Sequence, residues 1–330
     1  RRMSIEMNRP KEIVADILAK GVKIENIVFV GCGASMAESY PGRYFLESCA
    51  KKLRIFHFTA SEFNWNTPAW LGDTSVVISV SMGGNTPETV QANSVAKAAG
   101  ATVISVTHVA GSPLTKEADY CVIHDFETNY AAKLERMGYT MALALELLQQ
   151  TEGYEHYDKM LDGFAKIFDL AESSAQASRR VAREFAKEYQ NAPVIYVMSS
   201  GASTEVAYST SVCMLMEMQW IHSGNCHSGE FFHGPFEIVE KDVPFLLLMN
   251  DGRTRAVDSR ALTFLHRFQA KTTVIDAKDY GLSSVIDGSV ATFFNPLLHT
   301  AVYRVFEEEL ANVREHPLTK RRYMWKLEFS

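Results

Sequence analysis

The sequence predicts an α/β protein made of two three-layer α/β/α domains, each with a mainly parallel sheet. Two observations indicate this fold class. Short apolar runs rich in Val and Ile alternate with longer amphipathic stretches, which is typical of parallel strands joined by crossover helices. The run IVFVGCGAS in the first half is echoed by VIYVMSSGAS in the second, and both lead from an apolar strand into Gly-Ala-Ser. The pattern therefore indicates a duplicated α/β unit.

The apolar runs define the elements in order. The strands predicted in the first half are residues 25–31, 54–60, 74–81, 101–107 and 120–123. Those predicted in the second half are residues 193–198, 244–249, 272–276 and, more weakly, 290–294. The stretch 154–189 is rich in Ala, Glu, Lys and Arg with apolar spacing near 3.6, which predicts helix. We therefore expect a first domain at 8–152, a helical bridge at 153–190 and a second domain with a C-terminal tail at 191–330.

Composition excludes several classes of partner. Lys plus Arg number 33 against 39 Asp plus Glu, without blocks of one sign, so no basic surface for nucleic acid or anionic lipid is predicted. No apolar run reaches the roughly 18 residues that a membrane span requires. The five scattered cysteines form no Cys-x-x-Cys, which favours reduced thiols in the cytoplasm over a disulfide framework. We expect a cytoplasmic protein that binds a small molecule, and neither nucleic acid nor membrane.

The turn MGGNTPETV after the third strand is a candidate anion site. Thr86 is placed to cap a helix, Pro87 suits its first position, and Gly83 and Gly84 allow close backbone approach. Ser81 and Thr86 would add hydroxyl donors to amides at a helix N-terminus, where the dipole favours a charged oxygen. The alternative is an ordinary strand-to-helix turn, because Ser, Thr and Gly are common there for conformational reasons.

The turn GCGASMAESY after the first strand occupies an equivalent place. Gly31, Gly33 and Ser35 superficially resemble a dinucleotide-binding fingerprint. Met36 stands where that fingerprint needs a third glycine, so a nucleotide cofactor is disfavoured. The remaining interpretations are a second part of the anion site or a plain turn.

Taken together, CGAS, SMGGNTPET and GEFFHGP resemble the signatures of the sugar isomerase (SIS) domain family. The duplicated arrangement is similar to the isomerase half of glucosamine-6-phosphate synthase. The run LMEMQWIHSGNCHSGEFFHGPFEIV and the tail RRYMWKLEFS are still more similar to fructosamine-6-phosphate deglycases. In this family the first-half turns bind the sugar phosphate, which implies Ser35, Ser81, Gly83, Gly84 and Thr86 here. The family's usual run is closer to Ser-x-Ser-Gly-x-Thr, so Met82 and Gly83 leave fewer side-chain donors.

The resemblance also implies a catalytic pair, a helical glutamate and the histidine of the His-Gly-Pro turn. These positions are Glu217 and His233. Met and Leu residues and Trp220 surround Glu217 in sequence, and burial among them is expected to raise its pKa toward the working pH. The alternatives are a solvated helix glutamate and a surface or core histidine.

Three further residues are candidates with weaker support. Glu230 and Glu237 flank the His-Gly-Pro turn and are expected to hold its amides, orient His233 or contact substrate. Lys326 lies near the position of a sugar-contacting lysine of the synthases, and a solvated lysine is the alternative. His222, His227, Glu230 and His233 supply enough ligands for a metal, but Pro235 predicts a turn and the family implies no metal.

The resemblance implies cleavage of a 6-phosphorylated Amadori compound to glucose 6-phosphate and an amino acid, without a cofactor. It also implies a homodimer with shared active sites, or a higher oligomer. One alternative is a ketose–aldose or aminosugar isomerase using the same proton transfer. Another is a non-catalytic sugar-phosphate sensor, which the two halves and the absence of a basic DNA-binding segment disfavour.

Overall fold

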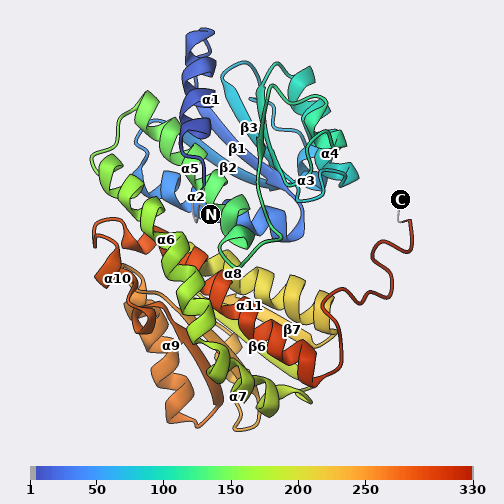
Figure 1. Cartoon of the computed structure of the whole chain (residues 1–330), viewed down its shortest axis with the longest axis vertical. Helices are drawn as coiled ribbons and strands as arrows, with labels where there is room; N and C mark the ends of the chain where they lie inside the picture. The colour runs from blue at the N-terminus through green and yellow to red at the C-terminus, as the bar shows by residue number, and fades with distance from the viewer. Residues whose placement is uncertain (1–4, 329–330) are drawn as a thin grey trace. The chain divides into compact units, whose positions relative to one another are not determined.

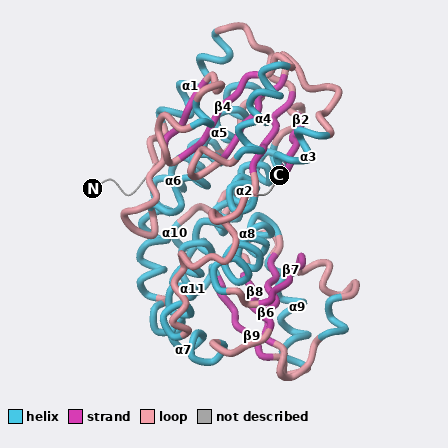
Figure 2. The backbone as a smooth tube through the Cα atoms, turned by 90° about the vertical axis from the view of Figure 1, so that its right-hand side faces the viewer, coloured by secondary structure: helices cyan, strands magenta, loops and turns pink. Residues whose placement is uncertain are grey.

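The structure is a computed structural model that describes residues 5–328 (Figure 1). The chain divides into two compact units between residues 169 and 170. This division falls inside one long helix, α6 (Tyr157–Ala177), so the predicted helical bridge contributes to both units. Each unit is built around its own parallel sheet (Figure 2).

The first sheet has five parallel strands in the order β2-β1-β3-β4-β5. Its strands are β1 (Asn26–Gly31), β2 (Arg54–Thr59), β3 (Ser75–Val80), β4 (Thr102–Thr107) and β5 (Tyr120–Ile123). Each lies within a segment that the sequence predicted as a strand. β1 and β3 are buried along their whole length, as expected for central strands covered on both faces.

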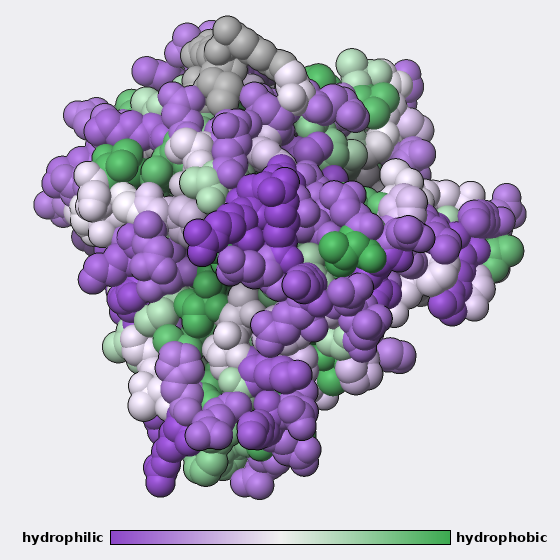
Figure 3. Space-filling view, turned by 60° about the horizontal axis from the view of Figure 1, so that its bottom comes forward, coloured by the Kyte–Doolittle hydropathy of each residue, from purple (hydrophilic) through white to green (hydrophobic). Residues whose placement is uncertain are grey.

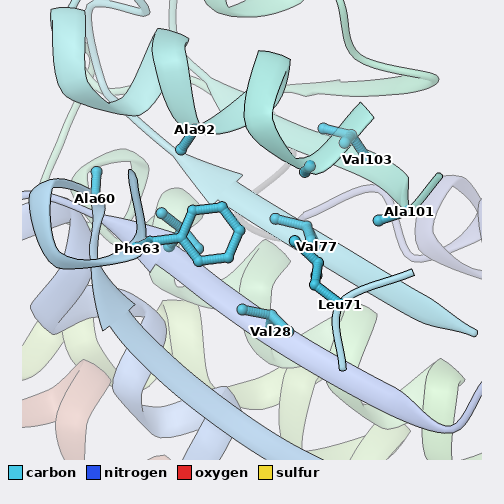
Figure 4. Packing of buried hydrophobic residues seen from close by; sticks show 10 residues of the cluster. Val28, Ala60, Phe63, Leu71, Val77, Ala92, Ala101 and Val103 are labelled. Carbon is cyan, nitrogen blue, oxygen red and sulfur yellow. The ribbon is translucent and has the colours of Figure 1, made fainter. Parts of the chain in front are cut away.

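Helices cover this sheet and complete its core. They are α1 (Asn8–Ala19), α2 (Gly33–Cys49), α3 (Ala60–Trp65), α4 (Pro87–Ala98) and α5 (Glu135–Thr151). Figure 4 shows Phe63 of α3 and Ala92 of α4 facing Val28, Val77 and Val103 of the strands. This interdigitation of helix and strand side chains fixes the positions of the turns that leave β1 and β3.

The second sheet has four parallel strands in the order β7-β6-β8-β9. Its strands are β6 (Val194–Ser199), β7 (His222–His227), β8 (Pro244–Met249) and β9 (Lys271–Asp276). The prediction missed β7, because HSGNCH has no apolar β-branched pattern and is held at the edge by backbone pairing with β6. The weak strand prediction at 290–294 was wrong. Ala291–Phe294 form a buried 3₁₀ turn that leads directly into α11 (Asn295–Val313).

The helices of the second unit surround this sheet. After α6 they are α7 (Arg179–Tyr189), α8 (Thr204–Ser209), the π-helix η4 (Thr210–Met218), α9 (Arg255–Arg267), α10 (Leu282–Val285) and α11. The core between the sheet and α9 contains Met198, Phe231, Phe245, Leu247 and Leu265. Phe231 is fully buried there and anchors the segment that follows β7.

Hydrophilic residues predominate on the face shown in Figure 3, with hydrophobic residues scattered between them. Among the residues that the structure describes, no helix combines the length and apolar character that crossing a bilayer requires.

Candidate functional site

The strand order of the first unit indicates where a ligand would bind. In a 2-1-3-4-5 parallel sheet the connections diverge between β1 and β3, and ligands bind beyond the carboxyl ends of those strands. Gly31 at the end of β1 is in register with Val80 at the end of β3. The two turns predicted to hold phosphate, one with Ser35 and one with Ser81–Thr86, therefore leave adjacent strands at the same level.

The turn after β3 is organised around one buried hydroxyl. The backbone N–H of Gly84 donates to Ser81 Oγ over 3.1 Å, and the Ser81 and Thr86 hydroxyls lie 3.1 Å apart. Ser81 is buried and Thr86 is partly exposed. Thr86 occupies the N-cap position of α4, as predicted, but its side chain bonds to Ser81 instead of capping the helix. Pro87 begins α4. Two hydroxyls thus lie beside a helix N-terminus, which suits an anion.

Gly84 is required by the shape of this turn. Its φ of +67° lies in the left-handed region, which favours glycine. A Cβ at this position would lie 2.0 Å from the Ser112 hydroxyl oxygen and 2.9 Å from that of Thr107. Gly83 is exposed, and a Cβ there would meet only the side chain of Asn85, at 2.9 Å. Close packing therefore explains why residue 84 is glycine, but it gives no reason for a glycine at residue 83.

The turn after β1 brings a buried charge pair to the site. Arg136, at the start of α5, donates from Nη1 to Ser35 Oγ over 2.9 Å. The same guanidinium forms an ion pair with Glu38 of α2, and both side chains are buried. Burial raises the pKa of Glu38, while Arg136 opposes that shift. The sequence analysis missed Arg136, because it lies 101 positions from Ser35 and belongs to no local motif.

In the second unit, the equivalent turns donate hydrogen bonds to a carboxylate of the protein itself. Ser200, after β6, donates its hydroxyl to Asp258 Oδ1 over 2.7 Å. The backbone N–H of Asn250, after β8, donates to Asp258 Oδ2 over 2.8 Å. Asp258 is completely buried, so the Ser200 hydroxyl and the Asn250 N–H already have an acceptor within the protein. This arrangement favours a single phosphate site per chain, in the first unit.

Glu217 lies on the π-helix η4, whose geometry the sequence did not indicate. π-Helical segments are rare in proteins overall, but those that occur often lie at functional sites. The Glu217 carboxylate forms an ion pair with Arg321 of the C-terminal tail, and 2.9 Å separate Arg321 Nη2 from Glu217 Oε1. The Glu217 side chain is 24% exposed. The Glu217 side chain is therefore partly buried, and the local sequence did not predict the guanidinium that lies beside it.

A cleft of about 690 Å³ lies beside this ion pair. It is lined by Val212, Met216, Glu217, Trp220, Ile221, His222, Arg321, Arg322, Tyr323 and Met324. Trp220, two residues after the end of the π-helix, has a φ of +56°, a strained value for a bulky residue. Strain of this kind clusters at functional sites, which adds to the case for this end of η4.

The His-Gly-Pro turn follows β7 and presents its histidine to solvent. His233 is exposed, and its backbone N–H donates to the carbonyl of Glu230 over 2.9 Å. Gly234 has a φ of +135°, which closes the turn. The Glu230 and Glu237 side chains are exposed, and within residues 5–328 the structure gives neither of them a bond to the turn amides or to His233. Within the described residues, no contact therefore supports the predicted role of Glu230 and Glu237 in holding the turn amides or orienting His233.

Lys326 is held within the tail. Its Nζ donates to the carbonyl oxygen of Arg321 over 2.7 Å. The side chains considered above as metal ligands do not converge on one point. They are those of His222, His227, Glu230 and His233. The described part of the chain contains no cluster of three or more His, Cys, Asp or Glu side chains arranged to hold a metal ion.

These features define a class of protein. The first unit has a 2-1-3-4-5 sheet with hydroxyls at its switch point, and the second has a four-stranded parallel sheet with a carboxylate beside a cleft. Open α/β sheets of this kind bind small ligands at the switch point. The chain belongs to the SIS domain family, whose model matches residues 22–150.

Individual relatives agree with this assignment along nearly the whole chain. A fructosamine deglycase of Bacillus subtilis is 40% identical over 310 residues, 94% of each chain. A fructoselysine 6-phosphate deglycase of Escherichia coli K12 is 27% identical over 77% of this chain and 73% of that protein. A crystal structure from Salmonella typhimurium, provisionally assigned as a phosphosugar isomerase, is 41% identical with a TM-score of 0.94 and covers 98% of this chain and 99% of that one.

Proposed function

We propose that this protein is a deglycase that cleaves a 6-phosphorylated Amadori compound to glucose 6-phosphate and an amino acid. The observation that carries the proposal is the 40% identity to a fructosamine deglycase over 94% of both chains. The second deglycase relative, named for a 6-phosphorylated substrate, supports the same reaction.

The phosphate group is held by the first unit. Ser81 and Thr86 donate hydroxyl hydrogen bonds, and the N-terminus of α4 supplies amides and a favourable dipole. Ser35, fixed by Arg136, contributes from the neighbouring turn, and Gly84 lets the backbone approach. Hydrogen bonds to charged oxygens contribute about 1.5–3 kcal/mol each, so these donors account for selection of a phosphorylated sugar.

The second unit moves the protons. His233 assists opening of the sugar ring to the free ketone. Glu217 then removes a proton from C1, giving an enaminol, and returns it to C2, giving an imine between the sugar and the amino acid. Water adds to the imine carbon and the C–N bond breaks, which releases the aldose phosphate and the amine. No electrons leave the substrate, so the reaction requires no redox cofactor.

The active unit of this enzyme is a homodimer with shared sites, in which His233 of one subunit works with Glu217 of the other. His233 is exposed in the isolated chain, and the residues described here give its side chain no partner. An exposed histidine in a turn anchored by the buried Phe231 is suited to reach into a neighbouring subunit. Glu230, Glu237 and Lys326 lie on exposed segments, where they would contact the substrate.

A substrate panel tests the activity. The enzyme is incubated with 6-phosphofructosyl amino acids that differ in the amino acid, and glucose 6-phosphate is followed with a coupled dehydrogenase. The unphosphorylated fructosyl amino acids are the matched controls and should react far more slowly. Fructose 6-phosphate is included as the substrate of the isomerase alternative. Turnover of fructose 6-phosphate without release of amine from any Amadori compound would contradict the deglycase proposal.

A further inference from the structure

The ion pair between Glu217 and Arg321 links the π-helix to the C-terminal tail. Arg321 donates from Nε over 3.2 Å and from Nη2 over 2.9 Å, and both bonds end on the same oxygen, Glu217 Oε1. The Arg321 side chain is only 6% exposed. A guanidinium that is removed from solvent and points two donors at one oxygen differs from a surface ion pair, which contributes little.

The remaining donors of Arg321 fix the tail itself. Nη1 donates to the carbonyl oxygens of Leu318 and Lys320 over 2.7 and 3.0 Å. Lys326 closes the segment by donating to the Arg321 carbonyl, and the Trp325 ring centroid lies 4.8 Å from the guanidinium carbon. Arg321 therefore lies at the centre of a compact loop, and its side chain joins that loop to Glu217.

The geometry leaves one carboxylate oxygen of Glu217 available. Both bonds from Arg321 go to Oε1, and no other described residue donates to Oε2. The carboxylate lies along the cleft, so fixing one oxygen determines where the other points. Proton transfer to carbon requires a base at a defined position, and an error of about 1 Å is enough to reduce the rate about 10²-fold.

We propose that Arg321 is a positioning residue for Glu217. It holds Oε1 and directs Oε2 toward the cleft as the proton acceptor, so an ordered base requires that the tail residue Arg321 is in place. This inference rests on the proposed proton transfer by Glu217. None of the local patterns in KRRYMWKLEFS distinguishes Arg321 from Lys320 or Arg322, whose cations lie over the Trp220 ring instead.

The test compares Arg321→Met with Lys320→Met. Both remove one positive charge from the same tail, but Lys320 is exposed and has no bond to Glu217. For Arg321→Met we expect kcat to fall about 10- to 100-fold with a much smaller change in KM. Arg321→Lys should restore part of the lost kcat, and Lys320→Met should leave both kcat and KM unchanged.

Hydrogen–deuterium exchange provides a readout that does not depend on activity. Amides 319–328 should exchange faster in Arg321→Met and in Glu217→Gln than in the wild type or in Lys320→Met. If Arg321→Met does not fold, Arg321→Lys decides through its kcat. Wild-type kcat and wild-type tail exchange in the Arg321 variants would overturn the inference. Normal turnover of Glu217→Gln together with faster tail exchange would have a different meaning. It would contradict proton transfer by Glu217, and so the proposed function, but it would still support a contact between Glu217 and the tail.

Discussion

The Ser81 and Thr86 hydroxyls are 3.1 Å apart at the N-terminus of α4. In Ser81→Ala and Thr86→Ala we expect KM for the phosphorylated substrate to rise with little change in kcat, because these bonds exist in both the ground and the transition state. Each lost bond to a charged oxygen should cost about 1.5–3 kcal/mol. Steady-state kinetics measure this, and an unchanged KM in both variants would count against the assigned turn.

Glu217 carries the predicted chemistry. Glu217→Gln keeps the shape of the side chain but cannot accept a proton, so kcat should fall by about 10²-fold or more. Substrate binding, measured by calorimetry with a 6-phosphofructosyl amino acid, should persist, because the phosphate donors belong to the first unit. Near-normal turnover in this variant would eliminate Glu217 as the proton carrier.

The turn between β3 and α4 depends on one glycine. Gly84→Ala would place a Cβ 2.0 Å from the Ser112 hydroxyl oxygen and force a left-handed conformation on alanine, which costs about 1–2 kcal/mol from the backbone alone. We expect a lower melting temperature and a loss of phosphate affinity larger than in Ser81→Ala. Gly83→Ala is the matched control, because a Cβ there meets only an exposed Asn85 side chain. Equal phosphate affinity in the two glycine variants would contradict this view of the turn.

Helix α11 contains a buried carboxyl that makes stability depend on pH. Glu307 is fully buried, and its Oε1 has no hydrogen-bond partner within the described chain. Burial raises its pKa from 4.5 to about 8, although Arg304 and Arg314 oppose the shift. The folded protein therefore keeps a proton that the unfolded chain releases. The contribution to stability is complete below pH 4.5 and is lost as the pH rises toward 8.

Glu307→Gln should remove this dependence, because the amide stays neutral. The free energy of unfolding of the wild type, minus that of the variant, should fall by about 1.4 kcal/mol per pH unit at its steepest between pH 5 and 8. Urea unfolding at several pH values measures this difference. A difference that stays constant with pH would show that Glu307 is ionised in the folded protein.

At the scale of the whole molecule, the proposed shared site predicts complementation between inactive subunits. Glu217→Gln and His233→Ala are each expected to be inactive as homodimers. After subunit exchange, a mixed dimer has one site with an intact Glu217 and His233 pair, so an equal mixture should recover roughly a quarter of wild-type activity. The measurement is turnover before and after exchange, with exchange itself followed by native mass spectrometry.

The double variant, with Glu217→Gln and His233→Ala in one chain, is the control. Mixed with Glu217→Gln, it forms dimers without any intact pair and should recover nothing. If the first mixture also recovers nothing despite proven exchange, Glu217 and His233 act within one subunit and the shared site is refuted.

The fold class and the place of the two turns proposed to hold phosphate could be predicted from local sequence patterns. The strands of the first sheet and the principal strands of the second could be predicted because apolar β-branched runs are local signals. Ser81, Gly84 and Thr86 could be placed together because a strand and the helix after it fix the turn between them. In contrast, β7 has no such signal and forms only because β6 offers it an edge.

The surroundings of the ionisable residues could not be predicted, because they depend on contacts between distant segments. Arg321 and Glu217 are 104 positions apart, and Arg136 and Ser35 are 101 positions apart. The sequence around Glu217 predicts an apolar environment, and the fold also places a guanidinium there. Glu307 has no local feature that marks it as buried. Local patterns set which face of an element is apolar, but the partner of a charge depends on which distant segments pack together, and that is a property of the folded chain.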